Sequence, residues 1–267
     1  MLQFHDIDKV AFSIGPISVH WYGITYLVGF AVGWALGHHR AKQPNSGWTT
    51  DQVADLLFYI AVGVIVGGRL GYMLFYNTSL PEGQSAQFWE VWKGGMSFHG
   101  ALIGIILACG LFARKSGKRY FEVSDFLAPL TPLGLASGRI GNFINGELWG
   151  KVSDAPWAMV FPSGGPLPRH PSMLYEALLE GFVLFAILWL YSRKPRPMMA
   201  TSGLFMVFYG IFRFVIEFVR VPDEQLGYVL FDWLTMGQIL TLPMVVGGLV
   251  MIYLGYRFYK PVPVAQS

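Results

Sequence analysis

The chain has 267 residues, of which 54% are hydrophobic, 16% aromatic and only 13% charged, and its formal net charge is +3. With a mean hydropathy of +0.46, this composition is far from that of a soluble domain of the same length. It predicts an integral membrane protein that contacts the lipid bilayer and binds no nucleic acid.

The first apolar run begins near residue 18, after Asp6, Asp8 and Lys9. No basic segment precedes it, no small-residue cleavage site follows it, and it is too long for the hydrophobic region of a signal peptide. We therefore expect it to remain attached as the first transmembrane helix.

Seven apolar windows are long enough to cross about 30 Å of hydrocarbon. They lie near residues 18–38, 54–76, 97–113, 123–142, 173–191, 202–219 and 236–257. The sequence therefore predicts an all-α, polytopic integral membrane protein with seven transmembrane helices. We expect one transmembrane domain over residues 1–267, with outer-face loops at about 77–96, 143–172 and 220–235.

The distribution of lysine and arginine predicts the orientation of these helices. Eleven basic residues fall on one side of the predicted helices and five on the other, while Arg69, Arg139 and Arg213 lie inside apolar windows. Because cytoplasmic loops carry an excess of Lys and Arg, we expect the N-terminus outside and the C-terminus in the cytoplasm.

The third window contains His99, within the glycine-rich segment 94–100, and the single cysteine, Cys109. A lone histidine near a helix start is usually structural, but its usable pKa makes His99 the best general-base candidate in the chain. Cys109 has no disulfide partner and no electropositive neighbours, so we expect it to be inert and either packed or lipid-facing.

The fourth window runs into an unusual polar segment, residues 138–150. Pro129 and Pro132 predict a kinked helix that ends in a polar turn at the membrane edge. Alternatively, a single arginine snorkels from the helix end and the asparagines cap turns. A functional site explains better why four polar groups fall within nine positions: Arg139, Asn142, Asn145 and Glu147.

The fifth and sixth windows carry further charges. Glu176 and Glu180 are one turn apart, and the face of the sixth helix presents Tyr209, Arg213, Glu217 and Arg220. Arg213 and Glu217 can pair across one turn, and a purely structural ion pair is one interpretation. The other is a phosphate site, because intramembrane arginines exceed their expected partners and a guanidinium binds phosphate oxygens bidentately.

All these polar residues are predicted in the outer half of the membrane. A transporter would be expected to place them near the midplane of broken helices, with internal repeats. The one-sided distribution favours a site open to the outer leaflet. A small-solute transporter, a lipid-binding scaffold and an acyltransferase that uses a phospholipid remain the alternatives.

Residues 138–150 also match a known signature, Gly-Arg-x-Gly-Asn-Phe-x-Asn-x-Glu-x-x-Gly, at every fixed position. On this segment the chain resembles the prolipoprotein diacylglyceryl transferase family. The segment 151–168 is shorter than in some relatives. Similar motifs nevertheless extend the resemblance over nearly the whole chain: His20-Trp21-Tyr22-Gly23, Gly67 to Tyr72, Gly94 to Gly100, Arg169 to Ser172 with Tyr175-Glu176, and Tyr209-Gly210 with Arg213 and Glu217.

The resemblance implies transfer of a diacylglyceryl group from phosphatidylglycerol to the lipobox cysteine of a prolipoprotein signal peptide, with release of sn-glycerol 1-phosphate. It implies a multi-pass protein of the bacterial inner membrane whose active site faces the periplasmic half. The substrate supplies the nucleophile, and neither a metal nor another cofactor is expected.

The residues expected to act follow from these motifs. Arg139 and Arg213 would stabilise the departing phosphate, and His99 would deprotonate the thiol, with His20, His170, Glu147 and Glu217 as rival bases. The resemblance implies that Arg139 contacts the headgroup and that the pocket beside it is shaped by Asn142, Glu147 and Gly150. The remaining residues expected to bind or orient substrate are Tyr22, Arg69, Tyr209 and Glu217.

Overall fold

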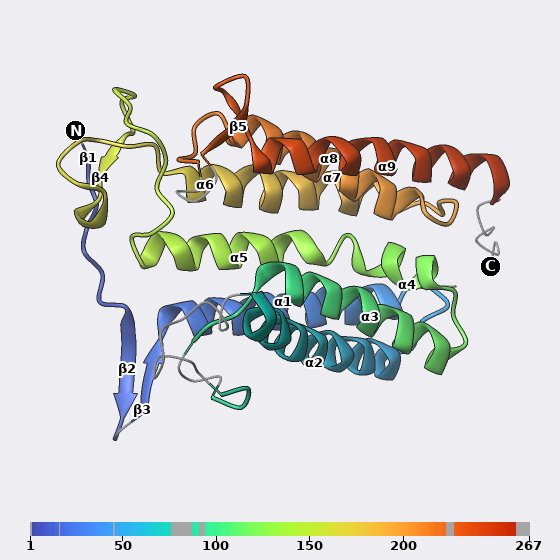
Figure 1. The fold of residues 1–267 in the computed structure, drawn as a ribbon. Helices are drawn as coiled ribbons and strands as arrows, with labels where there is room; N and C mark the ends of the chain where they lie inside the picture. The colour runs from blue at the N-terminus through green and yellow to red at the C-terminus, as the bar shows by residue number, and fades with distance from the viewer. Residues whose placement is uncertain are drawn as a thin grey trace. The chain divides into compact units, whose positions relative to one another are not determined.

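The computed structural model describes residues 2–15, 17–44, 46–75, 87–90, 94–222 and 227–259, and most of them are helical (Figure 1). The chain divides into two compact units. The smaller unit comprises Gly37–Ser124, and the larger comprises Met1–Leu36 with Asp125–Ser267.

The smaller unit is built on two helices, α2 (Thr50–Phe75) and α3 (Phe98–Ser116), which lie side by side (Figure 1). Glycines line their contact. A Cβ atom on Gly104 would overlap the carbonyl oxygen of Gly63, and one on Gly100 would overlap that of Gly67. Small residues let helix backbones touch, which is how helices associate closely in lipid. Cys109 of α3 is buried, which corresponds to the packed one of the two predicted positions.

The larger unit begins with short strands that the all-α prediction missed. β2 (Val10–Ile14) and β3 (Ile17–His20) form an antiparallel hairpin, whose turn includes Gly15 at φ +58°. The following helix, α1 (Trp21–Ala41), starts at Trp21 and not at residue 18. The predicted window could not distinguish the end of β3 from the start of α1, because a short apolar run fits a strand as well as a helix.

Two further strand pairs lie outside the helices of this unit. β1 (Leu2–Gln3) pairs in parallel with β4 (Met159–Val160), and β5 (Tyr228–Leu230) pairs antiparallel with β6 (Leu234–Thr235). Strands of two or three residues leave no periodic signal in the sequence.

The predicted kink in the fourth window is confirmed. The window is divided into α4 (Tyr120–Leu127) and α5 (Thr131–Ile144), with Pro132 in the first turn of α5. α5 packs closely on α1, because a Cβ on Gly141 would contact the side chains of Tyr22 and Thr25. The helix that carries the signature segment is therefore packed against the helix that carries Tyr22.

The fifth window is one helical segment with an irregular centre. α6 (Ser172–Glu176) continues into the π-helical segment η4 (Ala177–Val183) and then α7 (Leu184–Tyr191). Gly181 of η4 lies against Ala136 of α5, where a Cβ would overlap. π-Helical turns are rare and frequently occur at functional sites. Here the turn packs the helix that carries Glu176 and Glu180 against α5.

α8 (Ala200–Ile216) and α9 (Met236–Phe258) run side by side (Figure 1). Asp125 of α4 fixes the start of α8, because its carboxylate accepts hydrogen bonds from the backbone N–H groups of Met199 (2.6 Å) and Ser202 (2.7 Å). α9 begins with a capping box formed by Thr235 and Gln238.

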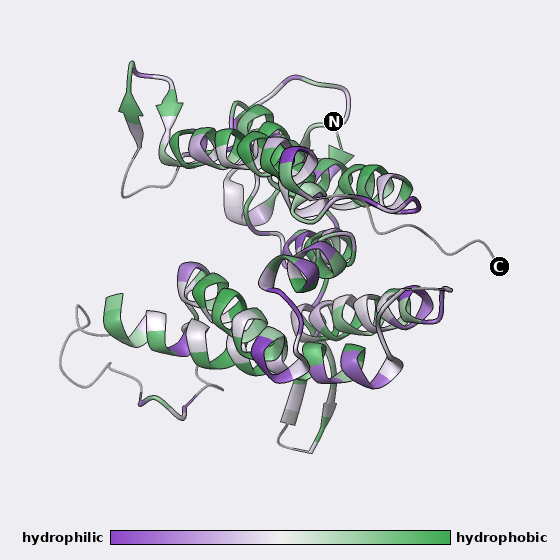
Figure 2. Ribbon diagram, turned by 90° about the vertical axis from the view of Figure 1, so that its right-hand side faces the viewer, coloured by the Kyte–Doolittle hydropathy of each residue, from purple (hydrophilic) through white to green (hydrophobic). Residues whose placement is uncertain are grey.

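Four of the described helical segments are long and apolar enough to cross a membrane: Thr50–Phe75, Phe98–Ser116, Ser172–Tyr191 and Met236–Phe258. Hydrophobic residues extend along the long helices in Figure 2. The chain is therefore a membrane protein, as predicted. The prediction of seven spans is only partly supported, because α8 has 17 residues, α1 is not among the four, and the fourth window is broken. Most of the predicted loop 77–96, and part of the loop 220–235, lie outside the described residues.

The contact between α2 and α3 can be tested with two glycines of the same helix. In Gly104→Ala the new Cβ meets backbone, so we expect the free energy of unfolding to fall by about 1–3 kcal/mol. In the control Gly110→Ala the new Cβ meets only Tyr120, at 4.0 Å, and we expect no loss or a small gain. Thermal unfolding of both variants in one detergent is the measurement. Equal stability of the two proteins would contradict a backbone contact at Gly104.

Candidate functional site

The larger unit contains a cluster of six charged side chains, which we call the charge cluster. Its members come from α5, α6, η4 and α8 and from the residues that follow α8: Arg139, Glu176, Glu180, Arg213, Glu217 and Arg220. Two features bring these side chains together. A close contact at a glycine places η4 against α5, and the four-residue spacing of Arg213 and Glu217 puts them on the same face at the end of α8.

Glu176 lies at the centre of the charge cluster and is fully buried. Arg139 Nε is 2.6 Å from its Oε2 atom, and Arg213 Nη1 is 3.4 Å from the same atom. Arg220 Nη1 donates a hydrogen bond to Oε1. Three cations therefore surround one carboxylate, which is the compensation that a buried charge requires.

Glu217 is held by a second set of partners. Its Oε1 atom is 2.5 Å from Arg213 Nη2, which confirms the predicted pairing across one turn. Arg220 Nε lies 3.2 Å from the same oxygen, and the Thr235 hydroxyl donates to Oε2 at 2.7 Å. A Cβ on Gly237 would lie against the Glu217 carboxyl group, so this carboxylate occupies the N-terminus of α9, where the helix dipole favours an anion.

The predicted excess of arginines over partners is wrong within the charge cluster. By residue count three arginines face three glutamates, because Glu176 and Glu180 contribute carboxyl groups that the sequence argument did not count as partners. The two kinds of side chain differ in access. The arginine side chains are 13–25% exposed, whereas the three glutamates are at most 5% exposed. The accessible part of the cluster is therefore cationic, as an anion site requires.

A second polar group lies at the end of α5. The side-chain amides of Asn142 and Asn145 donate to Glu147 Oε1, at 2.9 Å and 3.2 Å. Gly146 makes the tight turn between them possible with φ +64°. The predicted polar turn is thus present, and two amide donors fix the Glu147 carboxylate in one position.

Tyr22 approaches this turn from α1. Its ring lies against Gly141, and its hydroxyl lies 3.0 Å from that of Tyr26. Tyr22 therefore lies against the signature segment. Tyr209 lies one turn before Arg213 on α8 and stacks on Phe205.

Gly150 marks a close crossing of two chain segments. A Cβ there would overlap the carbonyl oxygen of Val219, and its backbone N–H donates to the His170 carbonyl at 2.8 Å. Gly150 and Arg220 also form an isolated bridge. The end of the signature segment is therefore placed beside Arg220 by a contact that only glycine allows.

Arg69, predicted to contact substrate, lies in the smaller unit and binds backbone carbonyls. It is fully buried, and its guanidinium donates to five backbone carbonyls, at distances of 2.5–3.2 Å: those of Gln87, Phe88, Glu90, Gly94 and Gly95. The N–H donors of Arg69 that a phosphate would need are therefore already bound to backbone carbonyl oxygens. Arg69 fastens the segment before α3 to α2.

His99, also in the smaller unit, is the second residue of α3 and is exposed. The helix is capped by Ser97, whose hydroxyl accepts from the Gly100 N–H. The His99 ring packs edge-on against Phe98. Within the part of the chain that the structure describes, His99 has no hydrogen bond or ion pair, so its ring nitrogens are available to a substrate.

His170, a rival base, is engaged by aromatic neighbours. Its Nδ1 atom is 3.1 Å from the Tyr175 hydroxyl, which accepts a hydrogen bond from Trp157 Nε1 at 2.6 Å. Burial lowers the pKa of His170, which Asp154 partly opposes, so the ring is neutral at pH 7. The Nδ1 atom is therefore occupied by the Tyr175 hydroxyl.

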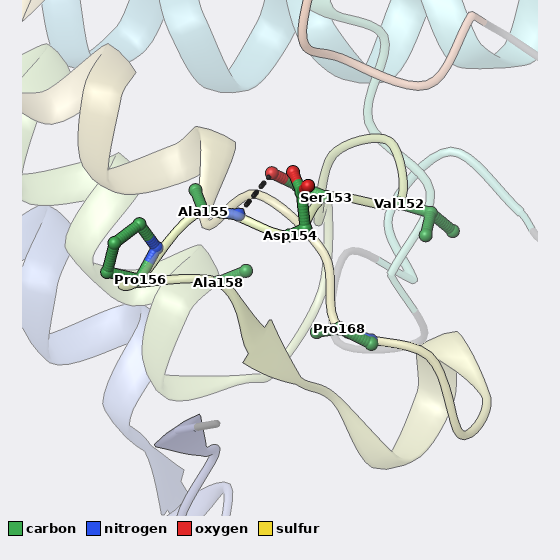
Figure 3. A pocket seen from close by; sticks show the side chains of 7 residues that line it. All are labelled: Val152, Ser153, Asp154, Ala155, Pro156, Ala158 and Pro168. Atoms are coloured by element: carbon green, nitrogen blue, oxygen red, sulfur yellow. Dashed lines mark hydrogen bonds between the residues drawn. The ribbon is translucent and has the colours of Figure 1, made fainter.

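A pocket of about 530 Å³ lies in the loop after the signature segment (Figure 3). Mostly small and apolar residues line it: Val152, Ser153, Asp154, Ala155, Pro156, Ala158 and Pro168. The Ser153 hydroxyl is used locally, accepting from the Ala155 N–H at 3.1 Å. The pocket contains none of the predicted site residues. The described residues also contain no group of three His, Cys, Asp or Glu side chains that could hold a metal ion.

Comparisons with a family model and with curated relatives both indicate the same family. A family model described as prolipoprotein diacylglyceryl transferase matches residues 9–254. Curated relatives named phosphatidylglycerol–prolipoprotein diacylglyceryl transferase include one from Pseudomonas aeruginosa, 58% identical over 96% of this chain and 97% of the relative. Another from Pseudomonas fluorescens is 56% identical over the whole of both chains, and one from Coxiella burnetii is 57% identical over 96% of this chain and 98% of the relative.

The charge cluster makes a prediction about stability. Glu176→Gln removes the central carboxylate and leaves three arginines undercompensated, so we expect the free energy of unfolding to fall by about 3–5 kcal/mol. The control Asp55→Asn breaks an exposed pair with Lys115, where we expect a change of about 1 kcal/mol or less. Denaturant unfolding of both variants in nanodiscs measures the difference. A loss in Glu176→Gln no larger than in Asp55→Asn would refute the central role of Glu176.

Proposed function

This chain belongs to the prolipoprotein diacylglyceryl transferase family, and we propose that it catalyses the first step of bacterial lipoprotein maturation. The enzyme transfers the sn-1,2-diacylglyceryl group of phosphatidylglycerol to the thiol of the lipobox cysteine and releases sn-glycerol 1-phosphate. The observation that carries this proposal is the charge cluster, whose accessible side chains are arginines among apolar helices.

The reaction breaks the bond between a glycerol carbon and a phosphate oxygen while a sulfur–carbon bond forms. Negative charge grows on the departing phosphate, so a cation that is already in place lowers the barrier. Arg139 and Arg213 hold the phosphate in this proposal, because their guanidinium groups stay charged in a poorly hydrated site. Glu176 and Glu217 orient these arginines. Glu217 therefore acts on the donor through Arg213.

The polar turn after α5 binds the uncharged part of the headgroup in this proposal. Asn142 and Glu147 offer hydrogen-bonding groups of fixed orientation to glycerol hydroxyls. Tyr22 and Tyr209 orient the substrates, and Gly150 shapes the pocket by allowing the close crossing beside Arg220.

His99 is the proposed general base. The acceptor brings the only thiol that the reaction needs, and only a few per cent of a free thiol is ionised at neutral pH. The exposed imidazole at the start of α3 can take the thiol proton. Among its rivals, His170 is engaged with Tyr175, while Glu147 and Glu217 are held by amide or guanidinium donors.

The cellular setting is also part of the proposal. The chain is placed in the bacterial inner membrane with seven spans, an outer N-terminus, a cytoplasmic C-terminus and one catalytic domain over residues 1–267. Its active site faces the periplasmic half, where the lipobox cysteine emerges. The one-sided distribution of Lys and Arg supports this orientation.

The direct test is incubation of the purified protein with phosphatidylglycerol and a lipobox peptide. The mass gain of one diacylglyceryl group on cysteine, with stoichiometric release of glycerol phosphate, is the expected result. Solute uptake without lipid transfer would favour a transporter. An acyl group on the peptide in place of a diacylglyceryl group would favour an acyltransferase.

The proposed role of Arg139 depends on the shape of its cation. Arg139→Lys keeps the charge but loses the planar fork, so we expect transfer to fall by about 100-fold or more, with normal membrane insertion. Initial rates with phosphatidylglycerol and the lipobox peptide measure the effect. Arg196→Lys, outside the charge cluster, is the control and should transfer at the wild-type rate. A wild-type rate in Arg139→Lys would make Arg139 a structural anchor.

The proposed role of His99 as the general base can be tested by its pH dependence. His99→Gln should lower the rate at neutral pH by about 100-fold, and raising the pH toward about 8.5 should restore part of it, because the thiol then ionises unaided. The control is His39→Gln, an exposed histidine in the last turn of α1. Rate profiles between about pH 6 and 9 distinguish the roles. A defect of equal size at every pH would assign His99 to substrate positioning.

A further inference from the structure

Glu180 is the least compensated member of the charge cluster. It is 1% exposed, and the nearest cation, Arg213 Nη1, lies 4.0 Å from its Oε1 atom. That oxygen has no hydrogen-bond partner among the described residues. Glu176 and Glu217, by contrast, each have an arginine nitrogen within 2.6 Å.

The surroundings of Glu180 do not supply another charge partner for it. α6 contributes Glu176, an anion on the same helical segment, and α8 contributes Arg213 and the neutral phenol of Tyr209. Arg139 and Arg220 act on Glu180 only at longer range, and both are paired with Glu176. An ionised Glu180 would thus be a buried charge whose nearest cation, Arg213, lies closer to Glu176 and Glu217, and such a charge costs several kcal/mol.

We propose that Glu180 carries a proton when the donor binds and thereby sets the charge of the phosphate site. Three arginines then face two carboxylates, which leaves one net positive charge. A phosphodiester carries one negative charge, so donor binding makes the charge cluster neutral. An ionised Glu180 would cancel the net charge before the donor arrives and would weaken its binding.

This inference rests on the proposed function, and it adds a determinant of donor specificity. A site with one net positive charge favours a phospholipid whose headgroup is uncharged beyond the phosphate, because arginines repel a headgroup ammonium. Glu180 contributes to this selection through the charge of the site, while Arg139 and Arg213 make the contacts.

The test is equilibrium binding of labelled phosphatidylglycerol to the full-length protein in phosphatidylcholine nanodiscs, without acceptor peptide. As the pH rises from about 6 to about 9, we expect Glu180 of the wild type to lose its proton and the affinity to fall by about tenfold or more. In Glu180→Gln the side chain is permanently neutral, so the affinity should not change over this range. Glu122→Gln, an exposed carboxyl on α4, is the control and should follow the wild type.

Two results would overturn the inference: a wild-type affinity that does not change with pH, or a Glu180→Gln protein whose affinity changes as the wild type's does. The second result would assign the titration to another group, such as a histidine. If phosphatidylglycerol binds with an affinity that is independent of pH, the proposed function still stands. If it does not bind at any pH, both the proposed function and the inference about Glu180 are contradicted.

An infrared difference spectrum between wild type and Glu180→Gln at pH 6 provides an independent measurement. A protonated carboxyl band is expected, and a carboxylate band would refute the assignment.

Discussion

The arrangement of the larger unit depends on the cost of burying charge. An ionised side chain among apolar helices is tolerated only with a partner, and Glu176 has three. These partners come from different parts of the chain: Arg139 from α5, and Arg213 and Arg220 from α8 and the residues after it. Because no single helix could compensate Glu176, the carboxylate ties α5, α6 and the end of α8 together. Glu217 extends the same constraint to α9 through Thr235.

Close backbone contacts make these charge contacts possible. Arginine and glutamate side chains span only a few ångströms across an interface, so the helices that carry them must approach closely. Gly181 brings η4 onto α5, Gly237 admits the Glu217 carboxyl to the start of α9, and Gly150 allows the crossing at Val219. The glycines around the site therefore have a positional role, since the same places with a side chain would separate the charges.

Much of this architecture could be predicted from the sequence, and the failures have physical causes. Hydrophobic windows located the helices, and Pro129 with Pro132 predicted the break before α5. The signature segment and the four-residue spacing of Arg213 and Glu217 predicted the polar turn and the ion pair. The role of Glu176 was missed although its spacing from Glu180 was visible, because the partners of Glu176 are 37 or more positions away in the sequence. The bonds from Arg69 to backbone carbonyls could not be predicted, because such partners leave no residue-type signal.

The chemistry explains why arginines paired with carboxylates suit this reaction better than free arginines would. Unpaired guanidinium groups inside lipid are costly, and they would bind any anion and release it slowly. In the proposed mechanism, carboxylate partners offset that cost while no anion is bound and hold each guanidinium in place, so little reorganisation is needed when charge develops on the phosphate. The glutamates are buried and the arginines are partly exposed, so an incoming anion meets the guanidinium groups first. In the proposed mechanism the same ion pairs hold the arginines in position for the phosphate, so the structural and functional interpretations of Arg213 and Glu217 are compatible.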